Sequence, residues 1–132
     1  MAKARKVKEI SFTMSNKVGL LSEVPTAIAG AKVNITAICA YAMDNDAYFM
    51  LTTDSNVKAK KALAPLGVTL EEEDVVEIEV PNKAGELQRV AKRLADAGID
   101  VEYMYATAGG GKTATCVFKT ADDKKTIKVI NK

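Results

Sequence analysis

Two stretches of the chain alternate hydrophobic and polar residues, as a β-strand does when one of its faces is buried. They are Ile10–Met14 and Val76–Val80. A short loop containing a glycine follows each stretch. After the second loop, Leu87, Val90 and Leu94 recur at spacings of three and four residues, which place them on one face of a helix. The pattern predicts a strand, a loop and a helix in succession, twice along the chain.

A pair of strands and a second helix are expected after each of these helices. The strands are expected at Val33–Ala42, Ala47–Thr53, Val101–Ala106 and Thr113–Lys119. Asp54-Ser55 and Asp122-Asp123 offer N-caps for the second helices, because their side chains accept from free backbone N–H groups. Gly67–Leu70 is expected to be a fourth strand in the first half. The second half reaches Lys132 at the end of its last helix, so its fourth strand is missing or is supplied from elsewhere.

The two halves are copies of one unit. A shift of 66 residues brings Asn16–Leu21 onto Asn82–Leu87 and gives nine identities between positions 16–42 and positions 82–108. Hydrophobic positions coincide even where the residues differ, as when Val33 and Ile35 fall on Ile99 and Val101. The halves are therefore expected to share one fold.

The element order β-α-β-β-α-β is that of the split βαβ, ferredoxin-like arrangement. The sequence therefore predicts an α+β fold of two tandem ferredoxin-like βαββαβ modules, residues 1–72 and residues 73–132. Each module is an antiparallel sheet with its helices on one face, and the second copy lacks its last strand. In this topology the fourth strand lies beside the first. The first strand of the second copy is thus expected to have an unpaired edge, which favours oligomerisation or capping by another strand.

Composition and charge exclude several classes of function. Hydrophobic residues make up 48% and charged residues 27% of the chain, the balance of a globular protein. The net charge of +2 is too small to indicate a nucleic-acid partner. The basic residues 1–6 and the acidic run Glu71–Asp74 are both expected to be solvated, the latter as a connection between the copies. No apolar run approaches the ~20 residues that a membrane span needs, so no membrane association is expected.

The residues needed for catalysis and for metal binding are also scarce. The chain contains no histidine, which is the commonest general base and the commonest metal ligand. Its two cysteines, Cys39 and Cys116, are far apart in apolar stretches and are expected to be reduced, buried thiols in a cytoplasmic protein. We expect no enzyme activity, no metal and no cofactor.

Two local motifs resemble nucleotide and RNA sites. Gly109–Thr113 ends like a phosphate-binding loop, but Ala106 stands where that motif needs its first glycine, and the segment joins two strands. Tyr103 and Tyr105 on one strand resemble a base-stacking platform, but the first copy has Ala37 and Cys39 at these positions. A flexible hairpin and a domain-interface role are the favoured interpretations.

The repeat resembles the ACT domain, a regulatory module that binds amino acids. In that family the first strand runs into a loop of the form Asn-x-x-Gly-x-Leu, and the second strand begins Val-Asn-Ile or a near variant. The first copy matches with Asn16–Leu21 and Val33-Asn34-Ile35, and the second with Asn82–Leu87 and Ile99-Asp100-Val101. The resemblance covers nearly the whole chain and is closest to stand-alone proteins made of an ACT pair with no catalytic domain.

The chemistry of the loops suits a free amino acid. Glycine at the strand-to-helix turn permits positive φ and close approach of a ligand. Free N–H groups at the start of the helix favour a carboxylate. An Asn amide accepts from an ammonium and donates to a carboxylate, and Asn34 and Asp100 are candidates to hold the ammonium. Asp100 departs from the family's Asn, so the two sites need not be equivalent, and the first loop is preferred. The same loops are also compatible with ordinary turn chemistry that binds nothing.

These inferences predict a non-catalytic, cytoplasmic regulatory protein that binds a free amino acid at the interface of paired modules. Its expected partners are a second copy of the chain, as a dimer, and an enzyme or regulator that it controls. The candidate ligand-binding residues are Asn16, Lys17, Val18, Gly19, Leu20, Leu21, Asn34, Asn82, Lys83, Ala84, Gly85, Glu86, Leu87 and Asp100. A purely structural pairing module and, less favoured, an RNA-binding ferredoxin-like protein are the alternatives.

Overall fold

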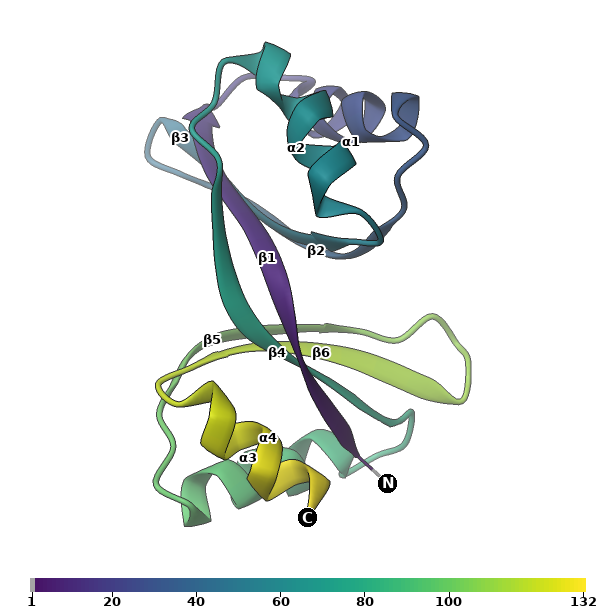
Figure 1. The fold of residues 1–132 in the computed structure, drawn as a ribbon, viewed down its shortest axis with the longest axis vertical. Coiled ribbons are helices and arrows are strands. Elements are labelled where there is room, and N and C mark those ends of the chain that lie inside the picture. Colours follow the sequence, from purple (N-terminus) through teal and green to yellow (C-terminus); the bar gives the residue numbers. More distant parts are fainter. Residues whose placement is uncertain (1) are drawn as a thin grey trace. The chain divides into compact units, whose positions relative to one another are not determined.

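The computed structural model describes residues 2–132 (Figure 1). The elements in chain order are β1 (Lys3–Ser15), α1 (Leu20–Gly30), β2 (Ile35–Met43), β3 (Asp46–Thr53), α2 (Asn56–Leu63), a 3-10 turn (Ala64–Leu66), β4 (Glu71–Pro81), α3 (Glu86–Asp96), β5 (Val101–Thr107), β6 (Thr113–Thr120) and α4 (Asp123–Asn131). The expected α+β fold of two tandem ferredoxin-like modules is confirmed.

The chain divides into two compact units. We call Lys8–Glu73 the first unit, and Asp74–Lys132 together with the residues up to Val7 the second unit. The strand order is β2-β3-β1-β4-β6-β5, so β1 and β4 each contribute to both units. Within the first unit the order is β2-β3-β1-β4, and within the second it is β5-β6-β4-β1. Each is the order expected of a βαββαβ module.

The core of the first unit lies between one face of its sheet and the helices α1 and α2. Antiparallel pairing of β1 with β3 places Phe12 opposite Phe49, and their rings stack with centroids 5.0 Å apart. Val24 and Ile28 of α1 are fully buried in the same cluster, as residues four apart on one helix face should be. Burial of each such side chain contributes about 1.5–3 kcal/mol.

The N-terminal residues supply the strand that the second copy lacks. Ala4 is buried in the core of the second unit, and the side chain of Asn131 at the end of α4 holds its backbone. The Ala4 N–H donates to Asn131 Oδ1 at 2.7 Å, and Asn131 Nδ2 donates to the Ala4 carbonyl oxygen at 2.8 Å. Arg5 pairs with Glu77 of β4 at 2.7 Å. The basic side chains of Lys3, Arg5 and Lys6 are exposed, as expected, but the segment forms part of β1. The first unit spans Lys8–Glu73, so the expected domain of residues 1–72 differs mainly at its start, because residues up to Val7 belong with the second unit.

The start of β4 also differs from expectation. Gly67–Leu70 is not a strand, although Val68 and Leu70 pack against the core of the first unit. The acidic run Glu71–Asp74 begins β4 and is not a loop connection; its three glutamates are exposed, and two of its four carboxylates lie within ion-pair distance of lysines. Lys60 donates to Glu72 at 2.8 Å, and Lys6 lies 3.6 Å from Asp74. The expected linker at Glu71–Asp74 and the expected strand at Val76–Val80 thus form one continuous strand, β4.

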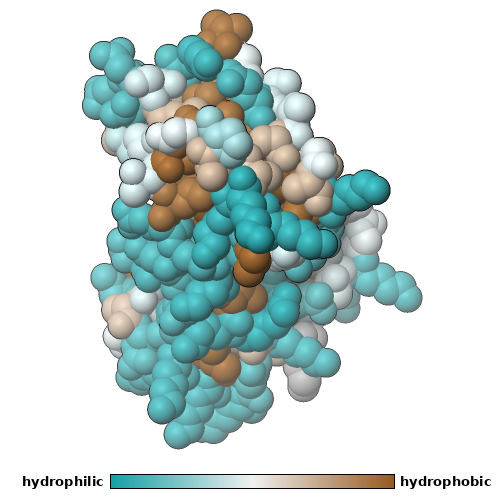
Figure 2. Space-filling view, turned by 45° about the horizontal axis from the view of Figure 1, so that its top comes forward, coloured by the Kyte–Doolittle hydropathy of each residue, from teal (hydrophilic) through white to brown (hydrophobic). Residues whose placement is uncertain are grey.

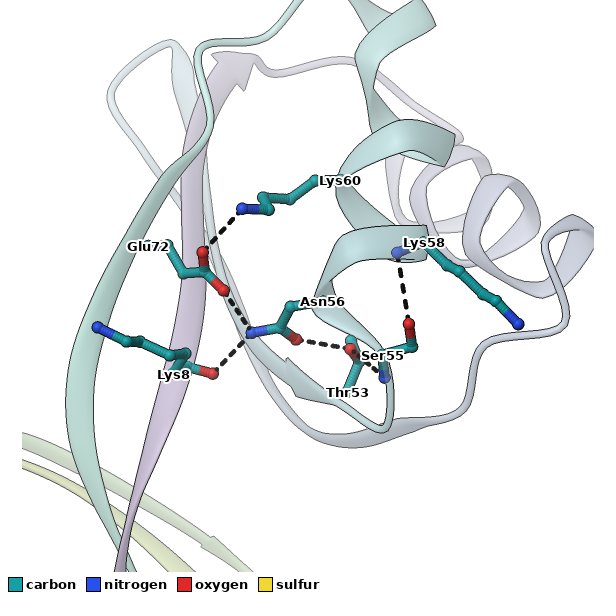
Figure 3. Close-up of polar contacts among 7 residues, drawn as sticks. All are labelled: Lys8, Thr53, Ser55, Asn56, Lys58, Lys60 and Glu72. Atoms are coloured by element: carbon teal, nitrogen blue, oxygen red, sulfur yellow. Dashed lines mark hydrogen bonds and ion pairs between the residues drawn. The ribbon is translucent and has the colours of Figure 1, made fainter.

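A polar cluster on α2 holds two strands of the first unit (Figure 3). Asn56 Nδ2 donates to the Lys8 carbonyl oxygen of β1 at 3.0 Å and to Glu72 of β4 at 2.9 Å. Its amide oxygen accepts from the Thr53 hydroxyl at 2.6 Å. The hydrogen bonds from Lys60 and Asn56 hold the pKa of the Glu72 carboxyl below its usual value. We call Asn56, Lys60 and Glu72 the α2 clasp.

Among residues 2–132 no helix has the length and apolarity needed to cross a membrane, and no group of acidic or cysteine side chains there is arranged to hold a metal ion. Cys39 and Cys116 are free thiols. Burial raises the pKa of both thiols, and the charge of Glu9 raises that of Cys39 further. Thiolate is the reactive form, so both cysteines are poorly suited to act as nucleophiles at neutral pH.

Candidate functional site

The first loop is fixed at both of its ends. It follows β1, and the Asn16 N–H donates to the carbonyl oxygen of Asn45 in the β2–β3 hairpin at 2.9 Å. Gly19 has a φ of 90°, a left-handed conformation that reverses the chain into α1. The ammonium of Lys17 lies 3.1 Å from the carboxylate of Glu23 in α1. These contacts define the shape of the loop.

A small apolar pocket lies beside this loop. We call it the loop-1 pocket. It has a volume of about 230 Å³ and is lined by Asn16, Lys17, Gly19, Leu20, Leu21, Ala40, Tyr41, Ala42, Ala47 and Phe49. Five of the six predicted residues of the loop are thus brought together. Val18 is fully exposed and is not part of the lining.

The rim of the loop-1 pocket is apolar and exposed. Leu21 is 64% exposed and Tyr41 is 47% exposed, and both lie at its border. β2, which provides Tyr41, is an edge strand of the sheet. In Figure 2 brown and pale residues gather in the upper part, which contains α1 and α2, and the lower part is mostly teal. Exposed apolar surface of this kind marks binding sites in soluble proteins.

The start of α1 offers fewer free donors than the sequence suggested. The Leu20 N–H donates to the Lys17 carbonyl oxygen at 3.3 Å, and the N–H groups of Ser22 and Glu23 donate to the Gly19 carbonyl oxygen at 3.0 and 3.1 Å. A ligand carboxylate at the first loop would have to compete with these bonds.

Asn34 and Asp100 lie away from the loops of their own units. Asn34 precedes β2, whereas the loop-1 pocket is at the other end of this strand, about 25 Å away at the usual rise per residue. The Asn34 N–H donates to the Asp54 carboxylate at 3.0 Å. The Asp100 carbonyl oxygen accepts from the Ala121 N–H at 3.0 Å, again at the far end of its strand. Within one unit, neither residue joins its loop in a single site.

The second loop repeats the backbone of the first. Gly85 has a φ of 89° and precedes α3, as Gly19 precedes α1. The Asn82 N–H donates to the Lys112 carbonyl oxygen at 2.8 Å, and its side-chain Nδ2 donates to the Gly111 carbonyl oxygen at 3.1 Å. The Asn82 amide thus anchors the loop to the β5–β6 hairpin. This is the turn role that the sequence left open.

A larger, charged groove lies along α3. We call it the α3 groove. It has a volume of about 870 Å³ and is lined by Ala2, Pro81, Lys83, Ala84, Glu86, Gln88, Arg89, Val90, Lys92, Arg93 and Asp96. Three predicted residues, Lys83, Ala84 and Glu86, belong to this lining. Leu87 is 47% exposed and, like Asn82 and Gly85, is not part of it.

The sequence prediction missed the residues that complete each site. Ala40, Tyr41 and Ala42 come from β2 and reach the loop-1 pocket because the end of β1 and the β2–β3 hairpin meet at the same end of the sheet. The predicted topology already contained this signal. The cationic positions Arg89 and Arg93 were hidden within an amphipathic helix, where charged residues usually only face solvent.

Comparison with known proteins places this architecture in a family. The model of an ACT domain pair matches residues 5–132. No curated protein sequence matches the chain. A protein of Bacteroides thetaiotaomicron has a solved structure with 30% identity and a TM-score of 0.87, over 97% of this chain and 88% of that one.

Two regulatory subunits of aspartate kinase have the same fold. That of Thermus thermophilus, in its ligand-free form, has 12% identity and a TM-score of 0.67, over 97% of this chain and 94% of that one. That of Thermus flavus has 13% identity and a TM-score of 0.65, over 98% and 95%. Together with the two βαββαβ units and their matching glycine loops, these findings show that the chain belongs to the ACT domain family, as an ACT domain pair.

Proposed function

We propose that this chain is a non-catalytic regulatory protein that binds a free amino acid with an uncharged side chain in the loop-1 pocket. The observation that carries the proposal is the lining of this pocket, in which Leu20, Ala40 and Phe49 provide apolar surface beside the first loop. Its volume of about 230 Å³ suits a ligand smaller than a drug molecule. ACT domain membership supports the ligand class.

We also propose that the ligand is enclosed only when a second module covers the pocket. The exposed Leu21 and Tyr41 at the rim, and the position of β2 at the edge of the sheet, favour a pairing of two copies of the chain through the first unit. Binding at such an interface would favour the paired arrangement, and an enzyme or regulator could respond to that change. The free thiols Cys39 and Cys116 favour action in the cytoplasm.

The proposal is tested by titrating the full chain with each of the twenty amino acids and measuring the heat of binding by calorimetry. We expect heat with one or a few amino acids that have uncharged side chains. Ala42 lines the pocket, and Ala42→Phe should weaken that binding at least tenfold because the new ring occupies the ligand's space. Ala108→Phe is the matched control, since Ala108 is the exposed equivalent in the second copy.

The alternative of a purely structural pairing module predicts a different outcome. In that case no amino acid gives heat at millimolar concentration, and Ala42→Phe changes only the oligomeric state measured by sedimentation. Such a result would exclude ligand binding at the first loop.

A further inference from the structure

The two loops differ in charge at two aligned positions, where Arg89 replaces Glu23 and Glu86 replaces Leu20. In the first unit, Lys17 and Glu23 form an ion pair with 3.1 Å between nitrogen and oxygen. The repeat aligns Lys83 with Lys17, but it aligns Arg89 with Glu23. The second copy therefore has two cations where the first copy has a neutral pair.

The backbone at these positions is the same in both copies. The φ and ψ angles are 90° and −6° at Gly19, and 89° and −9° at Gly85. The Glu23 N–H donates to Gly19 and the Arg89 N–H donates to Gly85, both at 3.1 Å. Lys83 and Arg89 therefore occupy the positions in the second copy that correspond to Lys17 and Glu23, which form an ion pair in the first copy. Both of them line the α3 groove.

Three other charged residues of the groove, Lys92, Arg93 and Asp96, have partners within the chain. Lys92 lies 3.1 Å from Asp96, and the Arg93 guanidinium donates to the Ile130 carbonyl oxygen at 3.2 Å. By contrast, the side chains of Lys83, Glu86 and Arg89 make no hydrogen bond or ion pair with any of residues 2–132, so the groove has two unpaired cations and one unpaired carboxylate. Two like charges at neighbouring positions repel each other, and an anion placed between them removes this cost.

We propose that the α3 groove binds an acidic amino acid, with a carboxylate of the ligand between Lys83 and Arg89 in the position that Glu23 fills in the first unit. Arg and Lys both form short, charge-assisted hydrogen bonds with carboxylates, and Arg does so in a bidentate geometry. Glu86 lies in the same lining, where the first copy has Leu20, and provides a carboxylate for the ammonium of the ligand. The groove, at about 870 Å³, has room for such a ligand and its water.

This inference deepens the proposed function, since it rests on the loops being ligand sites and names a second class of ligand. The two loops would then report two different amino acids, an uncharged one at the loop-1 pocket and an acidic one at the α3 groove.

The test uses the full chain, with L-glutamate, L-aspartate, L-leucine and inorganic phosphate as probes at constant ionic strength. We expect glutamate or aspartate to raise the melting temperature and to give heat in calorimetry. Arg89→Glu rebuilds the Lys–Glu pair of the first copy, so it should fold normally and lose at least tenfold in affinity for the acidic amino acid. Lys124→Glu makes the same change of net charge on the exposed surface of α4 and should leave the affinity unchanged.

Three results would overturn this assignment. The first is no response to either acidic amino acid. The second is an equal loss of affinity in Arg89→Glu and Lys124→Glu, and the third is a response to inorganic phosphate as large as that to the acidic amino acids. Binding at the loop-1 pocket is tested separately. Ala42→Phe should abolish any response to leucine and leave the response to glutamate unchanged. Failure at one loop is therefore distinguishable from failure at the other.

Discussion

Gly19 and Gly85 stand directly before α1 and α3, with φ angles of 90° and 89°. A side chain at either position would meet no atom within 4 Å, so space is not what requires glycine there. The requirement comes from the backbone, because a Cβ atom in the left-handed region clashes with the residue's own carbonyl oxygen. Both loops, and with them both proposed sites, depend on this one conformational property.

Replacing either glycine by alanine should therefore lower the free energy of unfolding by about 1–2 kcal/mol. Chemical denaturation of Gly19→Ala and Gly85→Ala checks this. Gly30 is the control, since it also has open space around it but lies in α1 with ordinary helical φ, and Gly30→Ala should be neutral or stabilising. A similar loss at all three positions would show that positive φ is not the cause.

At the scale of elements, the α2 clasp makes the free energy of unfolding depend on pH. Lys60 and Asn56 hold the pKa of Glu72 below its usual value, so the folded state binds its proton less tightly than the unfolded state does. The contribution of Glu72 is present above the unfolded pKa of about 4.3 and is lost as the pH falls through the lower, folded pKa. Because the Lys60–Glu72 pair is partly exposed, we expect this contribution to stability to be small.

Glu72→Gln should therefore lower the melting temperature at pH 7, and this effect should shrink as the pH falls below about 4. Melting curves of the two proteins across this range check the convergence. Glu71→Gln is the matched control, since Glu71 is the exposed neighbour on β4, and it should leave the pH profile of the parent unchanged. A difference of constant size at every pH would contradict the role of the carboxylate charge.

Elements could be predicted from the sequence where local chemistry decides them. Ser55 and Asp122 cap α2 and α4 by accepting from the N–H groups of Lys58 and Lys125, as their side chains suggested. The run Glu71–Asp74 misled the prediction, because four acidic residues resemble a solvated linker until Lys6 and Lys60 are placed beside them. The loop residues of the site were predicted, but the walls from β2 depend on long-range pairing.

At the scale of the whole molecule, the order of the chain differs from the order of the modules. The repeat predicted two consecutive copies, yet the second unit takes its fourth strand from the residues that precede the first unit. Only Ala4 among Lys3–Lys6 is buried, so this segment has no hydrophobic alternation that could identify it as a strand. Its position is set by backbone pairing with β4 and by Asn131, which no local pattern encodes.

This arrangement predicts that the N-terminal strand stabilises one unit selectively. Ala4→Asp places a charge in the core of the second unit and should cost about 1–3 kcal/mol there, because the carboxylate would be buried among apolar side chains. Hydrogen exchange should then quicken in α3, β6 and α4, while α1 and β3 keep their protection. Lys3→Asp puts the same side chain on the exposed part of the strand and should change neither. Equal loss of protection in both units would mean that they unfold as one, and the strand would then belong to the whole chain instead of to its second unit.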